Sequence, residues 1–199
     1  MENKQFIQDY LAETRNITEL ISVAAVDAAV ELLFDAWKNG NHIYTCGNGG
    51  SASTATHFAC DLVKTTTATG KLGIKAECLN DNIALVLALI NDDGFDNLFS
   101  EQLKVKAEKG DILVCVSVHG GSGSDKAGLW SQNLLKAMSY IREIGGKTIG
   151  LSGFDGGAMN EIADVSIIVP AKSTPQVESF HLVLEHLICS CLSERIMKS

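Results

Sequence analysis

Two segments that lie far apart in the sequence carry histidines close to carboxylates. The first, residues 45–61, ends in His57 and Asp61, which would point to the same side of a helix because they are four residues apart. The second segment, residues 174–197, contains four such groups: Glu178, His181, Glu185 and His186. Imidazoles and carboxylates together can bind a metal ion such as Zn²⁺ or transfer protons. At these spacings they can equally form surface contacts, so their position in the fold has to decide.

Helical geometry limits what the second segment can do alone. Glu178 and His186 are eight residues apart, about 80° around a helix, and therefore share a face. His181 lies about 140° from His186, so one helix cannot easily direct both histidines at one point. A metal site would need residues from both segments.

Two glycine-rich turns suggest a phosphate site. GNGGS (47–51) follows the apolar run 43–46, and SVHGGSGS (117–124) overlaps the end of the apolar run 111–118. Glycine allows positive φ angles and close approach of a ligand to the backbone, and a following helix offers unpaired N–H groups. Neither turn matches a Walker A or G-x-G-x-x-G motif. Taken alone, the first turn could equally be a tight strand-to-helix connection with Ser51 as the N-cap.

The alternation of apolar runs and helical periodicity predicts an α/β fold. Strands are expected at 43–46, 74–79, 111–118, 147–153 and 166–170. Helices are expected at 4–39 (two, with a break near 16–18), 51–64, 82–89, 97–109, 129–144 and 174–197, with a turn at 90–97. Because parallel sheets bind ligands at the carboxyl ends of their strands, the polar turns there should line one site.

Composition narrows the class of function. The chain has 199 residues, the length of one domain, and a net charge of −8 without a basic cluster, which argues against a nucleic-acid partner. The most apolar window, 83–90, is too short to span a bilayer, and the polar N-terminus is no secretory signal. The six cysteines form no C-x-x-C pair, as expected for reduced thiols in a cytoplasmic protein.

Several motifs together resemble the sugar isomerase (SIS) domain family, and within it the phosphoheptose isomerases. They are GNGGSxxxxxHFAxDL, INDDGF, LSGFDGG and a final helix with E-x-x-H-x-x-x-x-H. The resemblance implies a three-layer α/β/α sandwich with a central five-stranded parallel sheet, similar to flavodoxin. Residues 1–199 would form a single SIS domain, with helices in 1–39 and the α/β core in 40–199. It also implies a homotetramer with active sites between subunits.

The activity that this resemblance implies is a ketose–aldose isomerisation. Sedoheptulose 7-phosphate would become D-glycero-D-manno-heptose 7-phosphate through an enediol or enediolate, for lipopolysaccharide, capsule or related glycans. The implied acid–base pair is Asp61 and His186, and one Zn²⁺ per subunit would be bound by His57, Asp61, Glu178 and His186. The implied substrate-binding residues are Asn48, Gly49, Gly50, Ser51, Asn91, Asp92, Ser117, Val118, His119, Ser122 and Glu178.

The sequence departs from the family pattern at the site itself. Asp61 replaces a glutamate and is one methylene shorter; a misplacement of about 1 Å can cost about 10²-fold in rate. Glu178 replaces a glutamine, and Val118 and His119 replace two hydroxyl residues of the second turn.

Three alternatives therefore stay open. They are an isomerase of a different phosphosugar, a non-catalytic SIS protein that binds the replication initiator, and a phosphosugar-sensing regulator. Gly50, His57 and His186 favour an enzyme, and the chain has no appended pair of DNA-binding helices.

Overall fold

The computed structural model describes residues 3–67, 71–121 and 131–199. Its centre is a sheet of five parallel strands in the order β2-β1-β3-β4-β5. The strands are β1 (His42–Gly47), β2 (Lys75–Cys78), β3 (Ile112–Val116), β4 (Lys147–Gly153) and β5 (Val165–Val169). Every residue of β3 is buried, as expected for a central strand covered on both faces.

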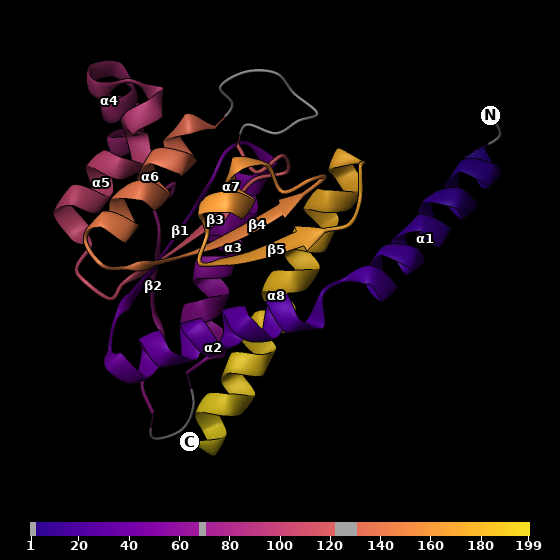
Figure 1. Ribbon diagram of the computed structural model, residues 1–199, viewed down its shortest axis with the longest axis horizontal. Coiled ribbons are helices and arrows are strands. Elements are labelled where there is room, and N and C mark those ends of the chain that lie inside the picture. Colours follow the sequence, from indigo (N-terminus) through magenta and orange to yellow (C-terminus); the bar gives the residue numbers. More distant parts are fainter. Residues whose placement is uncertain (1–2, 68–70, 122–130) are drawn as a thin grey trace.

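Helices cover both faces of the sheet (Figure 1). The helices are α1 (Asn3–Leu20), α2 (Val23–Asn39), α3 (Gly50–Thr65), α4 (Ile83–Asp93), α5 (Leu98–Lys106), α6 (Gln132–Glu143), α7 (Gly157–Ile162) and α8 (Thr174–Lys198). One apolar core joins the sheet to α2, α3 and α8, and a second joins its other face to α5, α6 and α7. The predicted three-layer α/β/α architecture is confirmed.

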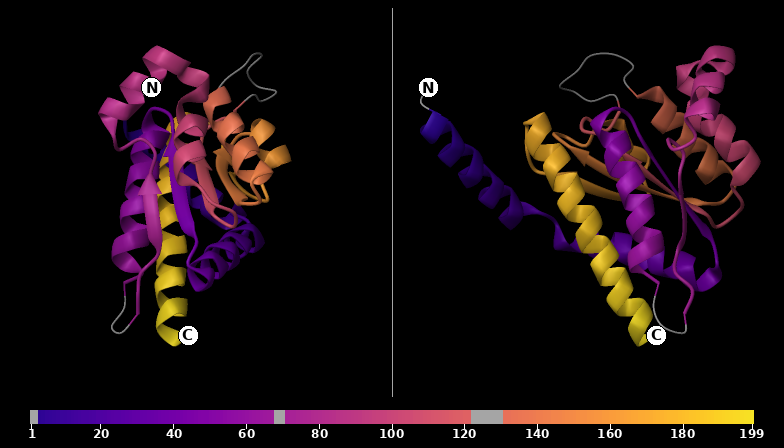
Figure 2. Two further views of the ribbon diagram at one scale, coloured as in Figure 1. Left: turned by 90° about the vertical axis from the view of Figure 1, so that its left-hand side faces the viewer. Right: turned by 180° about the vertical axis from the view of Figure 1, so that it is seen from behind.

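The first helix extends away from the rest of the molecule (Figure 2). Its apolar side chains Phe6, Ile7 and Leu11 are more than half exposed, whereas Ile17, near its end, is buried against the core. Among the described residues, no helix is long and apolar enough to cross a membrane. All six cysteines are free thiols, four of them buried.

Most predicted elements are found within a few residues of their predicted bounds, with three differences. The break between the leading helices lies at 21–22 rather than 16–18, because the hydroxyl of Ser22 caps α2 by accepting a hydrogen bond from the N–H of Ala25. Helix α4 continues through the predicted turn to Asp93 and ends at Gly94. The six-residue helix α7 was not predicted, since two glycines precede its first apolar residues.

The strand order places a ligand site between β1 and β3. In a doubly wound sheet of order 2-1-3-4-5, the connections from neighbouring strands β1 and β3 leave in opposite directions, which opens a crevice at their carboxyl ends. The turns after β1 and β3 are the two glycine-rich turns singled out from the sequence. The topology therefore brings both turns to one edge of the sheet.

Packing of α3 onto the core should dominate the stability of this part of the fold. Phe58 is fully buried on α3, and replacing it with alanine should lower the free energy of unfolding by about 3–5 kcal/mol. Val63→Ala on the same helix, where the side chain is 45% exposed, should change it by less than about 0.5 kcal/mol. Urea denaturation at one fixed protein concentration measures both. A loss for Phe58→Ala no larger than for Val63→Ala would contradict this packing.

Candidate functional site

The turn after β1 brings the backbone close to the first turn of α3. A Cβ on Gly47 would lie 2.4 Å from the carbonyl oxygen of Ser51, so only glycine fits there. Gly49 is the N-cap of α3, has a φ of 58° and provides no side-chain cap. The hydroxyl of Ser51 is therefore not the helix cap, and Ser51 instead lines a cavity beside the turn.

This cavity has a volume of about 270 Å³ and lies at the crevice between β1 and β3. Six of the predicted substrate-binding residues line it: Asn48, Ser51, Ser117, Val118, His119 and Glu178. Four residues that we did not predict complete the lining: Val116, Gly121, Ser131 and Thr174. Hydroxyl and amide groups, together with the positive end of the α3 dipole, suit an anionic ligand such as a phosphate.

Asn48 is held in place by a reciprocal amide pair. Its Nδ2 donates to Oδ1 of Asn133 over 3.0 Å, and Nδ2 of Asn133 donates back to Oδ1 of Asn48 over 2.9 Å. Asn133 is fully buried at the start of α6 and was not among the predicted site residues. Its own segment gave no signal for this role, because the pairing depends on a residue 85 positions away in the sequence.

Glu178 approaches the glycine turn from α8. A Cβ on Gly50 would lie 2.5 Å from Oε1 of Glu178, so glycine at this position makes room for the carboxylate. Gly50, the third glycine of the turn, therefore serves a contact between α3 and α8. The carboxylate of Glu178 also places a negative charge at the amino end of α3, beside the cavity.

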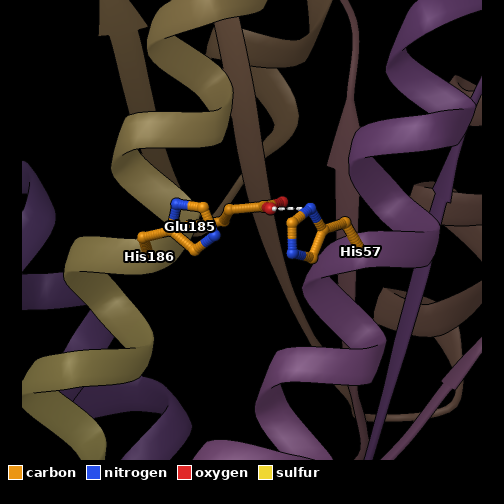
Figure 3. Close-up of side chains that lie close together, drawn as sticks. All are labelled: His57, Glu185 and His186. Carbon is orange, nitrogen blue, oxygen red and sulfur yellow. Dashed lines mark ion pairs between the residues drawn. The ribbon is translucent and has the colours of Figure 1, made fainter.

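Two helical turns further along the same pair of helices, His57, Glu185 and His186 come together (Figure 3), and Asp61 lies close to both histidines. Nδ1 of His57 lies 3.3 Å from Oε1 of Glu185, and its Nε2 lies 3.7 Å from Oδ1 of Asp61. Nε2 of His186 lies 3.4 Å from Oδ2 of Asp61. The two imidazole rings are 5.0 Å apart and nearly perpendicular. The structure thus brings together the two segments that carry histidines.

The cluster has the composition and spacing of a zinc site. Zn²⁺ binds imidazole nitrogens and carboxylate oxygens at about 2.0–2.1 Å, which sets tetrahedral ligand atoms about 3.3 Å apart. Asp61 approaches the two histidines through different oxygens, with Oδ2 3.4 Å from Nε2 of His186 and Oδ1 3.7 Å from Nε2 of His57. One ligand atom from each of His57, Glu185 and His186 also lies within 4.8 Å of the others. The residues present therefore fit the ion that the sequence suggested.

The members of the cluster differ in how far their side chains are exposed to solvent. The side chains of His57 and His186 are 44% and 50% exposed and that of Asp61 is 16% exposed, whereas that of Glu185 is fully buried. Burial, together with the charge of Asp61, raises the pKa of Glu185 to about 8. The histidines and Asp61 are thus accessible to a ligand, and Glu185 lies behind them.

The remaining predicted site residues lie elsewhere in the structure. Glu178 lines the cavity and does not belong to the cluster around His57, while Asn91 and Asp92 lie on the exposed last turns of α4 and do not line the cavity. Gly49 and Gly50 form the turn, and Ser122 lies outside the described residues.

The profile of the SIS domain family matches residues 5–153. The chain therefore belongs to the SIS domain family. Its relatives there include the phosphoheptose isomerase of Aliarcobacter butzleri (strain RM4018), which is 35% identical over 192 residues, 96% of each chain.

Two further comparisons agree with this family. The lincomycin biosynthesis protein LmbN of Streptomyces lincolnensis is 39% identical over 187 residues, which are 92% of this chain and 67% of that protein. The solved structure of phosphoheptose isomerase GmhA from Neisseria gonorrhoeae has a TM-score of 0.84 at 29% identity, covering 96% of this chain and 98% of that one.

His181 faces the sheet rather than the cluster, which gives it a distinct effect on stability. It is fully buried, and burial lowers its pKa to about 4, with only the backbone of Ser152 acting in the opposite direction. The unfolded chain therefore binds a proton below its pKa of 6.5 that the folded chain does not bind, and stability falls as the pH drops towards 4.

We predict that at about pH 5 the wild type loses about 2 kcal/mol of stability relative to about pH 7.5 through this residue, a loss that His181→Leu abolishes. Urea denaturation at both pH values and one protein concentration tests this. His42→Gln, an imidazole at the start of β1, serves as the control and should keep the wild-type loss. Equal acid losses in wild type and His181→Leu would refute the prediction.

Proposed function

We propose that this chain is a ketose–aldose isomerase that converts sedoheptulose 7-phosphate to D-glycero-D-manno-heptose 7-phosphate. The observation that carries the proposal is the convergence of His57, Asp61 and His186 along the same helix pair that lines the glycine-rich cavity. Relatives named phosphoheptose isomerase that match almost the whole chain support this choice. The product would serve the synthesis of heptose-containing glycans such as lipopolysaccharide or capsule.

The cavity and the cluster would bind opposite ends of such a substrate. Ser51 at the cavity and His57 in the cluster are six residues apart on α3, which corresponds to a rise of about 9 Å. A sugar 7-phosphate carries its phosphate and its carbonyl group at opposite ends of the carbon chain. The phosphate would bind to the hydroxyls and amides of the cavity, and the carbonyl end would extend towards the cluster.

The reaction moves a proton from C1 to C2 of the ketose and passes through an enediol. We assign this transfer to Asp61 and His186, whose side chains are 3.4 Å apart and accessible. A carboxylate and an imidazole in contact can exchange a proton, so one accepts the proton from carbon while the other donates it nearby. His57, on the other side of Asp61, orients that carboxylate.

A zinc ion is the cofactor that we propose for this site. His57, Asp61 and His186 would hold it, and Glu178, from its place beside Gly50, would contact substrate instead. When bound, zinc would supply positive charge to the oxygens of the enediolate. The proton transfer itself stays assigned to Asp61 and His186.

Substitution of the acid–base pair tests the activity. Asp61→Asn and His186→Gln should each lower kcat for sedoheptulose 7-phosphate by about 10²–10⁴-fold, because each removes one partner of the proton transfer. Aldose formation is followed with and without added zinc. His42→Gln and Glu194→Gln, an imidazole and an exposed carboxylate away from the cluster, are the matched controls and should keep the wild-type rate.

The outcomes separate the proposal from its alternatives. Absence of turnover by the wild type with and without zinc would refute the isomerase and favour a binding role. Turnover of another ketose phosphate but not of sedoheptulose 7-phosphate would favour an isomerase of a different phosphosugar. A different phosphosugar is worth testing because of one wall of the cavity. There His119 packs against Phe154, with ring centroids 4.2 Å apart, where the family pattern has hydroxyl residues.

We further propose a cytoplasmic homotetramer with active sites at its interfaces. Apolar side chains are exposed along α1, as described above, and on α4, where Ile83 and Leu87 are 65% and 61% exposed. Asn91 and Asp92 lie on the same exposed α4, from which they would reach a substrate bound to a neighbouring subunit.

Light scattering should give about four times the chain mass of 21.3 kDa. Phe6→Glu with Leu11→Glu on α1 should lower that mass, because charges on a buried face oppose association. The controls are Gln5→Glu and Asp9→Asn, which change polar residues on the same helix. A wild-type mass equal to one chain would refute the tetramer.

A further inference from the structure

The segment LSGFDGG (151–157), which spans the end of β4 and the start of α7, packs against the second glycine-rich turn. A Cβ on Gly120 would lie 1.9 Å from the carbonyl oxygen of Gly156. A Cβ on Gly157 would lie 2.3 Å from the carbonyl oxygen of His119. Backbone therefore lies directly on backbone at both points, and the cavity wall that carries His119 is tied to the segment after β4.

Phe154, in the middle of this segment, has a backbone conformation that is rare for a bulky residue. Its φ of 55° lies in the left-handed region. Its N–H donates a hydrogen bond to the carbonyl oxygen of Ala171 over 3.1 Å, and its side chain is half-buried against the apolar core. Such conformations persist only where the surrounding structure holds them, and they gather at functional sites.

His119 is the cavity residue that the ring of Phe154 contacts. The two ring centroids are 4.2 Å apart and the interplanar angle is 38°. Among the described residues that line the cavity, His119 has the only basic side chain and Glu178 the only acidic one. An imidazole rotates broadly about its second side-chain torsion, so its N–H has no fixed direction unless a neighbour restricts the ring. Phe154 is such a neighbour.

We propose that Phe154 is a positioning residue for ligand binding: its ring fixes the imidazole of His119, which donates a hydrogen bond to the anionic group bound in the cavity. The inference rests on the proposed function, because it takes this group to be the phosphate of the sugar. An imidazole that is already oriented loses less conformational freedom when the ligand binds, and binding is tighter for that reason. The donor also offsets part of the repulsion between the phosphate and Glu178.

Binding of inorganic phosphate to the full chain, measured by isothermal titration calorimetry from a phosphate-free buffer, tests the proposal. His119→Ala should raise Kd about 10–100-fold, because a hydrogen bond to a charged group is lost. Phe154→Gly should raise Kd about 3–10-fold, because the aromatic contact is lost while glycine adopts the left-handed conformation without strain. Phe154→Tyr retains the ring and should keep the wild-type Kd.

A double variant separates positioning from a general loss of structure. Because Phe154 acts through His119, Phe154→Gly should leave Kd unchanged in the His119→Ala background. Phe154→Asn, which places another residue type that tolerates the left-handed region, should repeat the effects of Phe154→Gly in both backgrounds. An equal rise in Kd in the wild-type and His119→Ala backgrounds would overturn the proposal, as would an unchanged Kd in His119→Ala.

The proton NMR signals of the His119 imidazole give a second measurement, which needs no ligand. The ring current of Phe154 should displace the carbon-bound imidazole protons from their usual chemical shifts, since the rings are in contact. The signals are assigned by their loss in His119→Ala. They should return towards the usual shifts in Phe154→Gly and stay displaced in Phe154→Tyr. Identical shifts in the wild type and Phe154→Gly would contradict the contact.

Trp37→Leu is the matched control. Trp37 is half-buried, stacks on Phe34 with ring centroids 5.4 Å apart, and lies shortly before the amino end of β1, at the other edge of the sheet. It should keep the wild-type Kd. If the wild type bound no phosphate, the proposal would fail together with the phosphate part of the proposed function. If it bound phosphate without converting sedoheptulose 7-phosphate, the isomerase would fail while the double variant would still decide the role of Phe154.

Discussion

The packing of α3 against α8 is the contact on which the candidate site depends. Both helices begin at the carboxyl edge of the sheet and run back along the same face, so residues at matching heights meet. Gly50 meets Glu178, and seven residues later on each helix His57 meets Glu185. Seven residues correspond to about two turns, so the same faces of the two helices meet again. The buried residues that hold this register, such as Phe58 and Leu184, belong to one core.

The same packing explains what the sequence could and could not predict. Alternating apolar strands and helical periodicity were sufficient for the parallel sheet, and the glycine-rich turns followed from their place after strands. The choice between Glu178 and Glu185 beside His57 could not be made, because these two residues lie only about 20° apart around α8. Only the longitudinal register of α8 against α3 separates them, and that register is set by side-chain packing across the interface.

Two further differences between the prediction and the structure have other causes. Asn91 and Asp92 looked like turn residues because polar residues and glycine follow them, yet α4 continues until Gly94, where a φ of 82° ends it. Asn133 could not be chosen from the sequence because its importance comes from a partner 85 residues away. Residues that act through long-range pairing leave no periodic signal in their own segment.

The cavity combines an attraction for anions with a resident negative charge. The amino end of α3 and the hydroxyls of Ser51 and Ser117 favour a phosphate, while Glu178 lies at the same helix end. A neutral glutamine there would leave the helix end to the ligand alone. The packing of His119 on Phe154 further changes the shape of the wall beside Ser117. Both of these departures from the expected family pattern, Glu178 and His119, line the cavity.

The amide pair between Asn48 and Asn133 has a consequence for how this protein can diverge. Each side chain donates one hydrogen bond to the other and accepts one from it, so the two amides are reciprocal partners. An aspartate at either position would place two hydrogen-bond acceptors against each other. An aliphatic residue would leave two polar atoms of the remaining asparagine without their partners. A homologue that replaces one of these asparagines therefore has to replace the other as well. The sequence of the first glycine-rich turn is in this way coupled to that of α6.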